Sequence, residues 1–173
     1  MKKIILLLFI LIAFSISCKK EITKPIEEYG SNSYLIYEKV LQNQFAQTDF
    51  LIILRDTTKE EFIDTLDIIN IRGSIPAILE ETFKSYTAVN RLKIKLKNIL
   101  NIKSLKLESE IKNPPDNSVY VWLSNVGYDH TNTQAIVTAG IIYGPEAGGG
   151  ILFFLTKEND EWNIEGTYGL WIC

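Results

Sequence analysis

The sequence predicts a single α+β domain in which N-terminal helices pack on a C-terminal antiparallel β-meander sheet. Of its 173 residues, 46% are hydrophobic and 23% are charged, which is the composition of a globular chain with a core. Helical apolar spacing is found before residue 91, whereas β-branched and aromatic runs separated by short polar turns follow residue 119. Helices followed by a meander give a layered domain, with the helices covering the inner face of the sheet.

The first two elements are expected before residue 60. A helix is expected over residues 33–46, because apolar side chains recur there at helical spacing. A strand buried on both faces is expected over residues 50–54, a continuous apolar run between Asp49 and Arg55. The apolar side chains of the helix are Tyr34, Tyr37, Leu41 and Phe45.

Two further helices are expected before residue 91. Thr58 and Glu61 have the spacing of a capping box ahead of Phe62, which predicts a short helix that begins there. The next helix is expected to begin at Ser74, with Pro76 in its first turn. Its apolar stripe consists of Ile75, Leu79, Phe83 and Tyr86.

The remaining elements are strands. Leucine and isoleucine alternate with charged residues over 92–97 and again over 105–108, although the first stretch also fits a continuation of the helix. Asn-Pro-Pro-Asp-Asn at 113–117 breaks the pattern. Four strands rich in β-branched and aromatic residues are then expected. They cover residues 119–126, 134–143, 151–156 and 162–172.

The N-terminus has the layout of a secretory signal. Two lysines precede an apolar run from Ile4 to Phe14, which is shorter than the roughly 20 residues that a membrane-spanning helix needs. Removing residues 1–17 leaves 16 basic and 21 acidic residues, a formal net charge of −5. An acidic exported chain argues against a nucleic-acid partner.

Cys18 directly follows small residues, and this pattern resembles the lipobox of bacterial lipoproteins. In that class the cysteine becomes the mature N-terminus and carries acyl chains, and a following residue such as Lys19 favours the outer membrane. Ser15 stands where the pattern usually has leucine, so ordinary cleavage after Ser17 is the alternative. The organisation expected is a signal peptide over 1–17, a lipidated tether over 18–31 and one globular domain over 32–173.

The only other cysteine is Cys173. If Cys18 is acylated, Cys173 has no partner within the chain and is a lone thiol in an oxidising compartment. If Cys18 is free, a bridge between the two ends of the mature chain becomes available. The two alternatives exclude each other.

The C-terminal third carries a recurrent pattern: LSNVGY at 123–128, TQAIV at 133–137, a glycine run at 148–150 and WNI at 162–164. This order resembles the C-terminal half of small exported lipoproteins of unknown function that are frequent in Bacteroidota. The closing meander is also similar to the sheet of cystatin-like and nuclear-transport-factor-2-like domains. The lipoprotein family supplies no activity, so the resemblance implies a location and leaves the function open.

Four side chains are candidates for a ligand-binding site. Arg55 ends a buried strand and Gln134 lies within an otherwise apolar one. If both face the concavity of the sheet together with Trp122 and Tyr128, they supply the few convergent polar groups of a pocket. The alternative is that they are satisfied polar groups at strand ends.

Residues 144–150 (GPEAGGG) predict a flexible hairpin loop. They do not predict a phosphate cradle, because the Gly-Lys-Ser/Thr ending is missing and a strand follows. A protruding loop is a candidate partner surface, and its residues are Gly144, Glu146, Gly148 and Gly149.

Six basic residues without an acidic one stand between Arg91 and Lys106, including Lys93, Lys95 and Lys97. They predict a solvated sheet face or a lysine-guarded edge, and the alternative is a surface for an anionic ligand.

Asp129 and His130 are adjacent, and His130 is the only histidine. We interpret them as part of a hairpin turn, because no metal-ligand spacing and no GxSxG motif is present. No metal or cofactor is expected.

The sequence therefore favours a membrane-anchored, non-catalytic module that binds an unidentified protein or small molecule in the cell envelope. One alternative is an envelope hydrolase that uses Asp129 or Glu146, assisted by His130 or Arg55. Another is an inhibitor or immunity-type protein whose net charge of −5 attracts a basic toxin or lysozyme.

Overall fold

The computed structural model describes residues 31–173 apart from 47–48, 62, 76, 98–101 and 103. The predicted signal peptide, Cys18 and the tether up to residue 30 lie outside the described residues. Within the described part the elements follow one another as helices and short strands, then a run of long strands. In chain order they are α2 (Ser31–Phe45), β1 (Ile52–Leu54), α3 (Thr65–Ser74), α4 (Glu80–Asn90), β2 (Leu105–Leu107), η1 (Glu108–Glu110), β3 (Val119–Leu123), β4 (Gly127–Tyr128), β5 (Gln134–Gly144), β6 (Ala147–Glu158) and β7 (Glu161–Ile172).

The strands form one mixed sheet in the order β2-β1-β3-β5-β6-β7, with β4 paired to the start of β5. The C-terminal meander predicted from the sequence is confirmed: β3, β5, β6 and β7 pair antiparallel. The predicted α+β class is confirmed as well. β1 runs parallel to both β2 and β3, so the sheet is not antiparallel throughout. β1 has a neighbouring strand on each side, and each of its three residues is buried.

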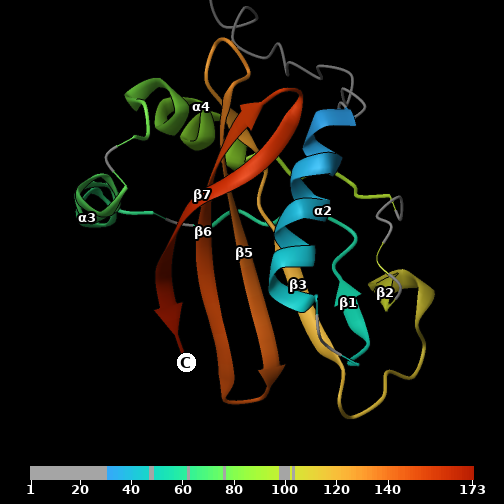
Figure 1. The fold of residues 1–173 in the computed structure, drawn as a ribbon. Coiled ribbons are helices and arrows are strands. Elements are labelled where there is room, and N and C mark those ends of the chain that lie inside the picture. Colours follow the sequence, from blue (N-terminus) through green and yellow to red (C-terminus); the bar gives the residue numbers. More distant parts are fainter. Residues whose placement is uncertain (1–30, 47–48, 62, 76, 98–101, 103) are drawn as a thin grey trace, which may run out of the picture.

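Helices cover both faces of the sheet, not the inner face alone as the sequence analysis expected. α2 packs on one face, while α3 and α4 lie on the other (Figure 1). Two clusters of buried side chains result, one between the sheet and α2 (the α2 core) and one between the sheet and the helices α3 and α4 (the α4 core). Neighbouring residues of the long strands point into different clusters: Phe153 packs in the α2 core and Phe154 in the α4 core. The unbroken apolar run of β6 reflects this double burial.

The short helix predicted ahead of Phe62 and Leu66 is present as α3, but the capping box predicted for it at Thr58 and Glu61 is wrong. Thr58 instead bridges to the segment after α4: its hydroxyl donates to the Leu92 carbonyl (3.2 Å) and accepts from the Ile94 amide (2.9 Å). α3 begins seven residues later, at Thr65, behind a capping box made by Asp64 and Asp67. Two aspartates make this cap, which the Ser/Thr-x-x-Glu pattern could not find.

The helix expected from Ser74 begins only at Glu80, because Ser74 ends α3 and Leu79 is the N-cap of α4. Of its expected apolar stripe, Ile75, Phe83 and Tyr86 are buried in the α4 core, although Ile75 precedes the helix, and Leu79 is exposed. Pro76 lies outside the described residues.

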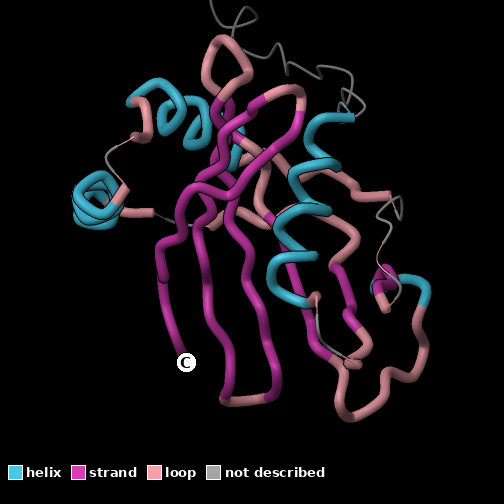
Figure 2. Tube along the Cα trace, in the orientation of Figure 1, coloured by secondary structure: helices cyan, strands magenta, loops and turns pink. Residues whose placement is uncertain are grey.

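Residues 92–97 form no strand; one isolated bridge joins Lys95 to Thr57. Figure 2 shows the described part of the connection from α4 to β2 as loop. Leu96 is nevertheless buried, because its side chain packs in the α2 core. Its backbone amide donates to the Asp56 carbonyl (2.7 Å), which fixes the loop at this point. Among the described residues, no helix has the length and hydrophobicity that crossing a membrane requires.

Candidate functional site

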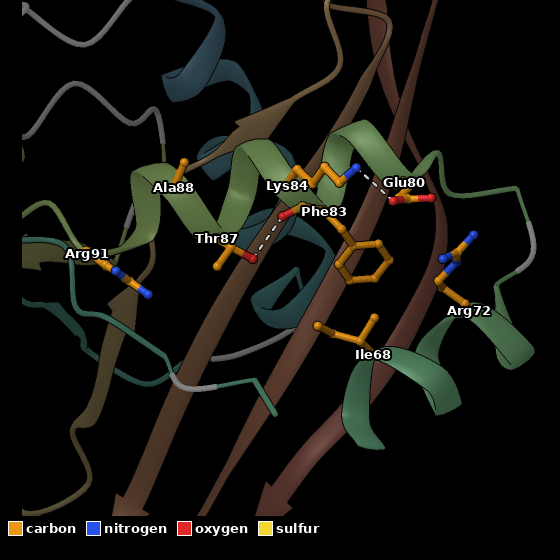
Figure 3. Close-up of a pocket in the computed structure, with 8 residues that line it drawn as sticks. All are labelled: Ile68, Arg72, Glu80, Phe83, Lys84, Thr87, Ala88 and Arg91. Carbon is orange, nitrogen blue, oxygen red and sulfur yellow. Dashed lines mark hydrogen bonds and ion pairs between the residues drawn. The ribbon is translucent and has the colours of Figure 1, made fainter. Parts of the chain in front are cut away.

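A hollow with an apolar floor lies between α3 and α4. This groove has a volume of about 470 Å³, in the range of ligand pockets. Figure 3 shows Phe83 of α4 pointing toward Ile68 of α3, with Arg91 at one end and Arg72 at the other. The remaining lining residues are Glu80, Lys84, Thr87 and Ala88.

The lining residues of α4 recur every three or four positions, so they share one face of the helix. Two polar side chains hold this helix at its ends, Gln134 from β5 and Asn125 from the connection between β3 and β4. Gln134 of β5 accepts hydrogen bonds from the Leu79 amide (3.1 Å) and the Thr82 hydroxyl (3.3 Å) at the N-terminal end. The buried Asn125 amide donates to the Val89 and Leu92 carbonyls at the C-terminal end, both at 2.6 Å.

The groove is electrostatically positive. Three of its eight lining residues are basic and one is acidic. The acidic one, Glu80, pairs with Lys84 at 2.8 Å. The hydrogen bond and charge of Lys84, with the charge of Arg72 added, hold the pKa of Glu80 below its usual value. Arg91 stands apart from this pair at the other end, so an anion can approach the groove from two sides (Figure 3).

Sequence reasoning did not find this groove as a site. Its residues come from two helices, and only the packing of α3 beside α4 brings them together. Of the basic run singled out in the sequence, only Arg91 lines the groove, whereas Lys93, Lys95 and Lys97 are exposed on the following loop.

The four candidate ligand-binding residues do not converge on one pocket. Gln134 is occupied in holding α4, as its bond from Nε2 to the Ala77 carbonyl (3.0 Å) also shows. Tyr128 faces the α2 side, where its hydroxyl shares a hydrogen bond with Ser33 (2.9 Å) and its ring lies 5.9 Å from Trp162. Arg55 and Trp122 do lie together, with the guanidinium 6.0 Å from the indole ring.

Trp122 belongs to a stacked pair on the α4 side of the sheet. Its indole stacks on that of Trp171 with centroids 5.7 Å apart and planes at 11°. Both rings lie over glycines of one row across the sheet: Trp122 pairs with Gly140, and Gly140 pairs with Gly150. A Cβ on either glycine would lie 2.0–2.2 Å from an indole atom, so only glycine fits.

One carboxylate holds both indoles. Glu61 accepts from the Trp171 Nε1–H at 2.9 Å and from the Trp122 Nε1–H at 3.3 Å. The Lys59 ammonium lies 4.2 Å from the Trp122 ring centroid, in the range of a cation–π contact. The pair is thus enclosed by its neighbours, and we assign it to packing.

The glycine run is not a loop, which corrects the prediction for residues 144–150. β5 ends at Gly144, a turn at Pro145 and Glu146 follows, and Gly148 and Gly149 lie within β6. Glycine is required at position 148 because the neighbouring backbone approaches it closely: a Cβ there would lie 2.7 Å from the Ile141 carbonyl oxygen. The protruding part is the short turn.

Asp129 and His130 occupy the predicted turn but have separate partners. The buried Asp129 carboxylate accepts the Thr133 amide (2.8 Å), the Gln134 amide (2.7 Å) and the hydroxyls of Thr131 and Thr133. His130 is exposed, and its Nδ1 lies 2.8 Å from the Glu81 carboxylate.

Among the described residues, Glu81, Asp129 and His130 are the group of metal-ligating type, with one ligand atom of each within 4.8 Å of the others. The Asp129 oxygens are already occupied by donors of its own turn. A general base or metal ligand needs a lone pair that is available to substrate or ion. The contacts of Asp129 therefore indicate that it stabilises the turn, and they disfavour a role as a general base or metal ligand.

We expect Asp129→Asn to lower the free energy of unfolding by about 1–3 kcal/mol at pH 7, because an amide nitrogen would face hydrogen-bond donors. Burial acts to raise the pKa of Asp129, but the Thr131 hydroxyl, the two backbone amides and the Thr133 hydroxyl outweigh it and lower the pKa to about 2. The carboxylate is thus a stabilising group above about pH 4, and this stabilisation is lost as the pH falls toward 2. Urea unfolding at pH 7 and pH 2 measures both effects.

The exposed Asp116 supplies the control for this prediction. Asp116→Asn should leave stability unchanged within about 0.5 kcal/mol. Equal losses for the two variants, or a difference between Asp129→Asn and wild type that persists undiminished at pH 2, would contradict the role given to Asp129.

Comparison with known proteins adds no further assignment: no protein-family model, no curated protein and no solved structure matches the chain.

Proposed function

We propose that the protein is a lipid-anchored, non-catalytic binding module of the cell envelope, held at the outer membrane, which takes an anionic amphiphile in the groove between α3 and α4. The groove carries the proposal: Ile68 and Phe83 give it an apolar floor, and basic side chains stand at both ends. A ligand with a hydrocarbon chain and a phosphate or carboxylate head matches both features.

The N-terminal pattern supports the location. The short apolar run, the small residues and Cys18 are typical of an exported chain that is acylated at its first mature residue. The turn geometry of Asp129 favours the binding module over the hydrolase, because its carboxylate is engaged within its own turn.

The test is a calorimetric titration with dodecyl phosphate below its critical micelle concentration, using the exported chain with Cys18→Ser so that its own acyl chains do not compete. Dodecyl phosphate should bind, and dodecyltrimethylammonium, with the same chain and the opposite charge, should not. Arg91→Glu should weaken binding about ten-fold, since it replaces an attraction by a repulsion. Lys106→Glu is the control, because Lys106 is exposed on β2, outside the groove.

Glu80→Gln should have the opposite effect on affinity for dodecyl phosphate. It removes the partner of Lys84 and leaves that ammonium to the ligand, so dodecyl phosphate should bind two- to five-fold more tightly. Equal binding of both amphiphiles, or unchanged affinity in Arg91→Glu, would refute the groove as the site.

A further inference from the structure

A second pocket lies at the other end of the sheet. It has a volume of about 400 Å³ and is bounded by residues 114–118 on one side and by the turn from β5 to β6 on the other. In Figure 1 this turn is at the lower end of the sheet, whereas α2 begins at the upper end. The pocket is therefore remote from the point where the N-terminal segment joins the domain.

The lining of this pocket differs from that of the groove between α3 and α4. It contains two aromatic rings, Tyr120 and Tyr143, and the Tyr143 side chain is 55% exposed. Asp116 is its one ionisable carboxylate, and no basic side chain lines it. The pocket thus offers flat apolar surfaces and hydrogen-bond acceptors, and it repels anions.

Ser118 adds an observation of a different kind. The residue is 6% exposed, and its hydroxyl has no hydrogen-bond partner among the described residues. Its backbone amide donates to the Pro115 carbonyl (3.0 Å), which fixes the segment while the hydroxyl stays unsatisfied. A buried hydroxyl without a partner costs about 1–3 kcal/mol, so a polar partner supplied by a ligand would recover this free energy.

We propose that this pocket binds a neutral saccharide, separately from the amphiphile groove. A sugar ring presents an apolar C–H face that can lie on the exposed Tyr143 ring, as an aromatic platform requires. Its hydroxyls are donors for the Asp116 carboxylate and partners for the Ser118 hydroxyl. The absence of basic residues from the lining disfavours an acidic sugar.

The probes are maltoheptaose, cellohexaose and chitohexaose at millimolar concentration, followed by changes in the NMR spectrum of the exported chain with Cys18→Ser. At least one should bind, with shifts in Tyr120 and Tyr143. Tyr143→Ala should weaken that binding about ten-fold. Because Tyr143 is largely exposed, this variant should fold with unchanged thermal stability.

Ser118→Ala separates ligand binding from a structural role. It should weaken binding about five-fold while the midpoint of thermal unfolding stays equal or rises, because an unsatisfied hydroxyl is removed. No binding of any of the three sugars overturns the proposal, as does binding that Tyr143→Ala leaves unchanged. Either result leaves the amphiphile groove untouched, since none of the residues replaced here lines it.

Discussion

Gly127→Ala is expected to lower the free energy of unfolding by about 3 kcal/mol or more. A Cβ at Gly127 would lie 2.3 Å from Cα and 2.4 Å from the backbone nitrogen of Tyr86, so the main chains of β4 and α4 would have to separate. Tyr86 cannot absorb this shift, because its hydroxyl is fixed to Thr138 at 3.1 Å within the α4 core. Urea unfolding followed by tryptophan fluorescence measures the loss.

Gly73 supplies the matched control. It lies in α3, and a Cβ added there meets nothing within 4 Å. Gly73→Ala should therefore raise stability by about 0.5–1 kcal/mol through helix propensity. If both alanine variants were equally stable, the close approach of α4 to β4 would not be a constraint on the fold.

The same contact predicts a chemical property of Tyr86. Burial, with a smaller contribution from the Glu61 charge, raises the pKa of Tyr86 to about 12 against the hydrogen bonds it makes. In Gly127→Ala, separation of the two elements would expose the phenol and bring its pKa back toward 10. A spectroscopic titration of the tyrosines thus reports on the same packing as the unfolding experiment.

The long strands could be predicted from the sequence because their signal is local. β5, β6 and β7 are adjacent in the chain, short turns join them, and β-branched and aromatic residues fill them. The parallel pairing of β1 with β2 and β3 is not local: α3 and α4 separate β1 from β2, and the same helices with β2 and η1 separate β1 from β3. No spacing pattern within one segment contains that information.

The candidate site was harder to predict from the sequence for the same reason. Gln134 stood out as a polar residue in an apolar strand, and this anomaly was real, but its partners Leu79 and Thr82 lie on a different element. Trp122 and Trp171 meet because Gly140 and Gly150 are in register between their strands, which only the pairing of the sheet determines. A sequence shows that such residues are unusual, whereas the packing shows what satisfies them.

The largest functional effect is expected from Cys18→Ser, which should abolish incorporation of radioactive palmitate and release the chain from the membrane fraction. Each CH₂ group of an acyl chain contributes about 0.8 kcal/mol to membrane partition, and two or more chains give stable anchoring. Labelling and fractionation of cells that express each variant measure both effects.

Cys173→Ser is the matched control, because it removes the only other thiol while leaving the predicted acylation site intact. Cys173 is exposed at the end of β7, where its backbone pairs with Gly148 and its thiol is free. This variant should therefore keep the label and the membrane location of the wild type. An unlabelled wild-type chain, or one whose mobility on non-reducing gels shows a bridge between Cys18 and Cys173, would overturn the anchor, because acylation and the bridge require the same sulfur.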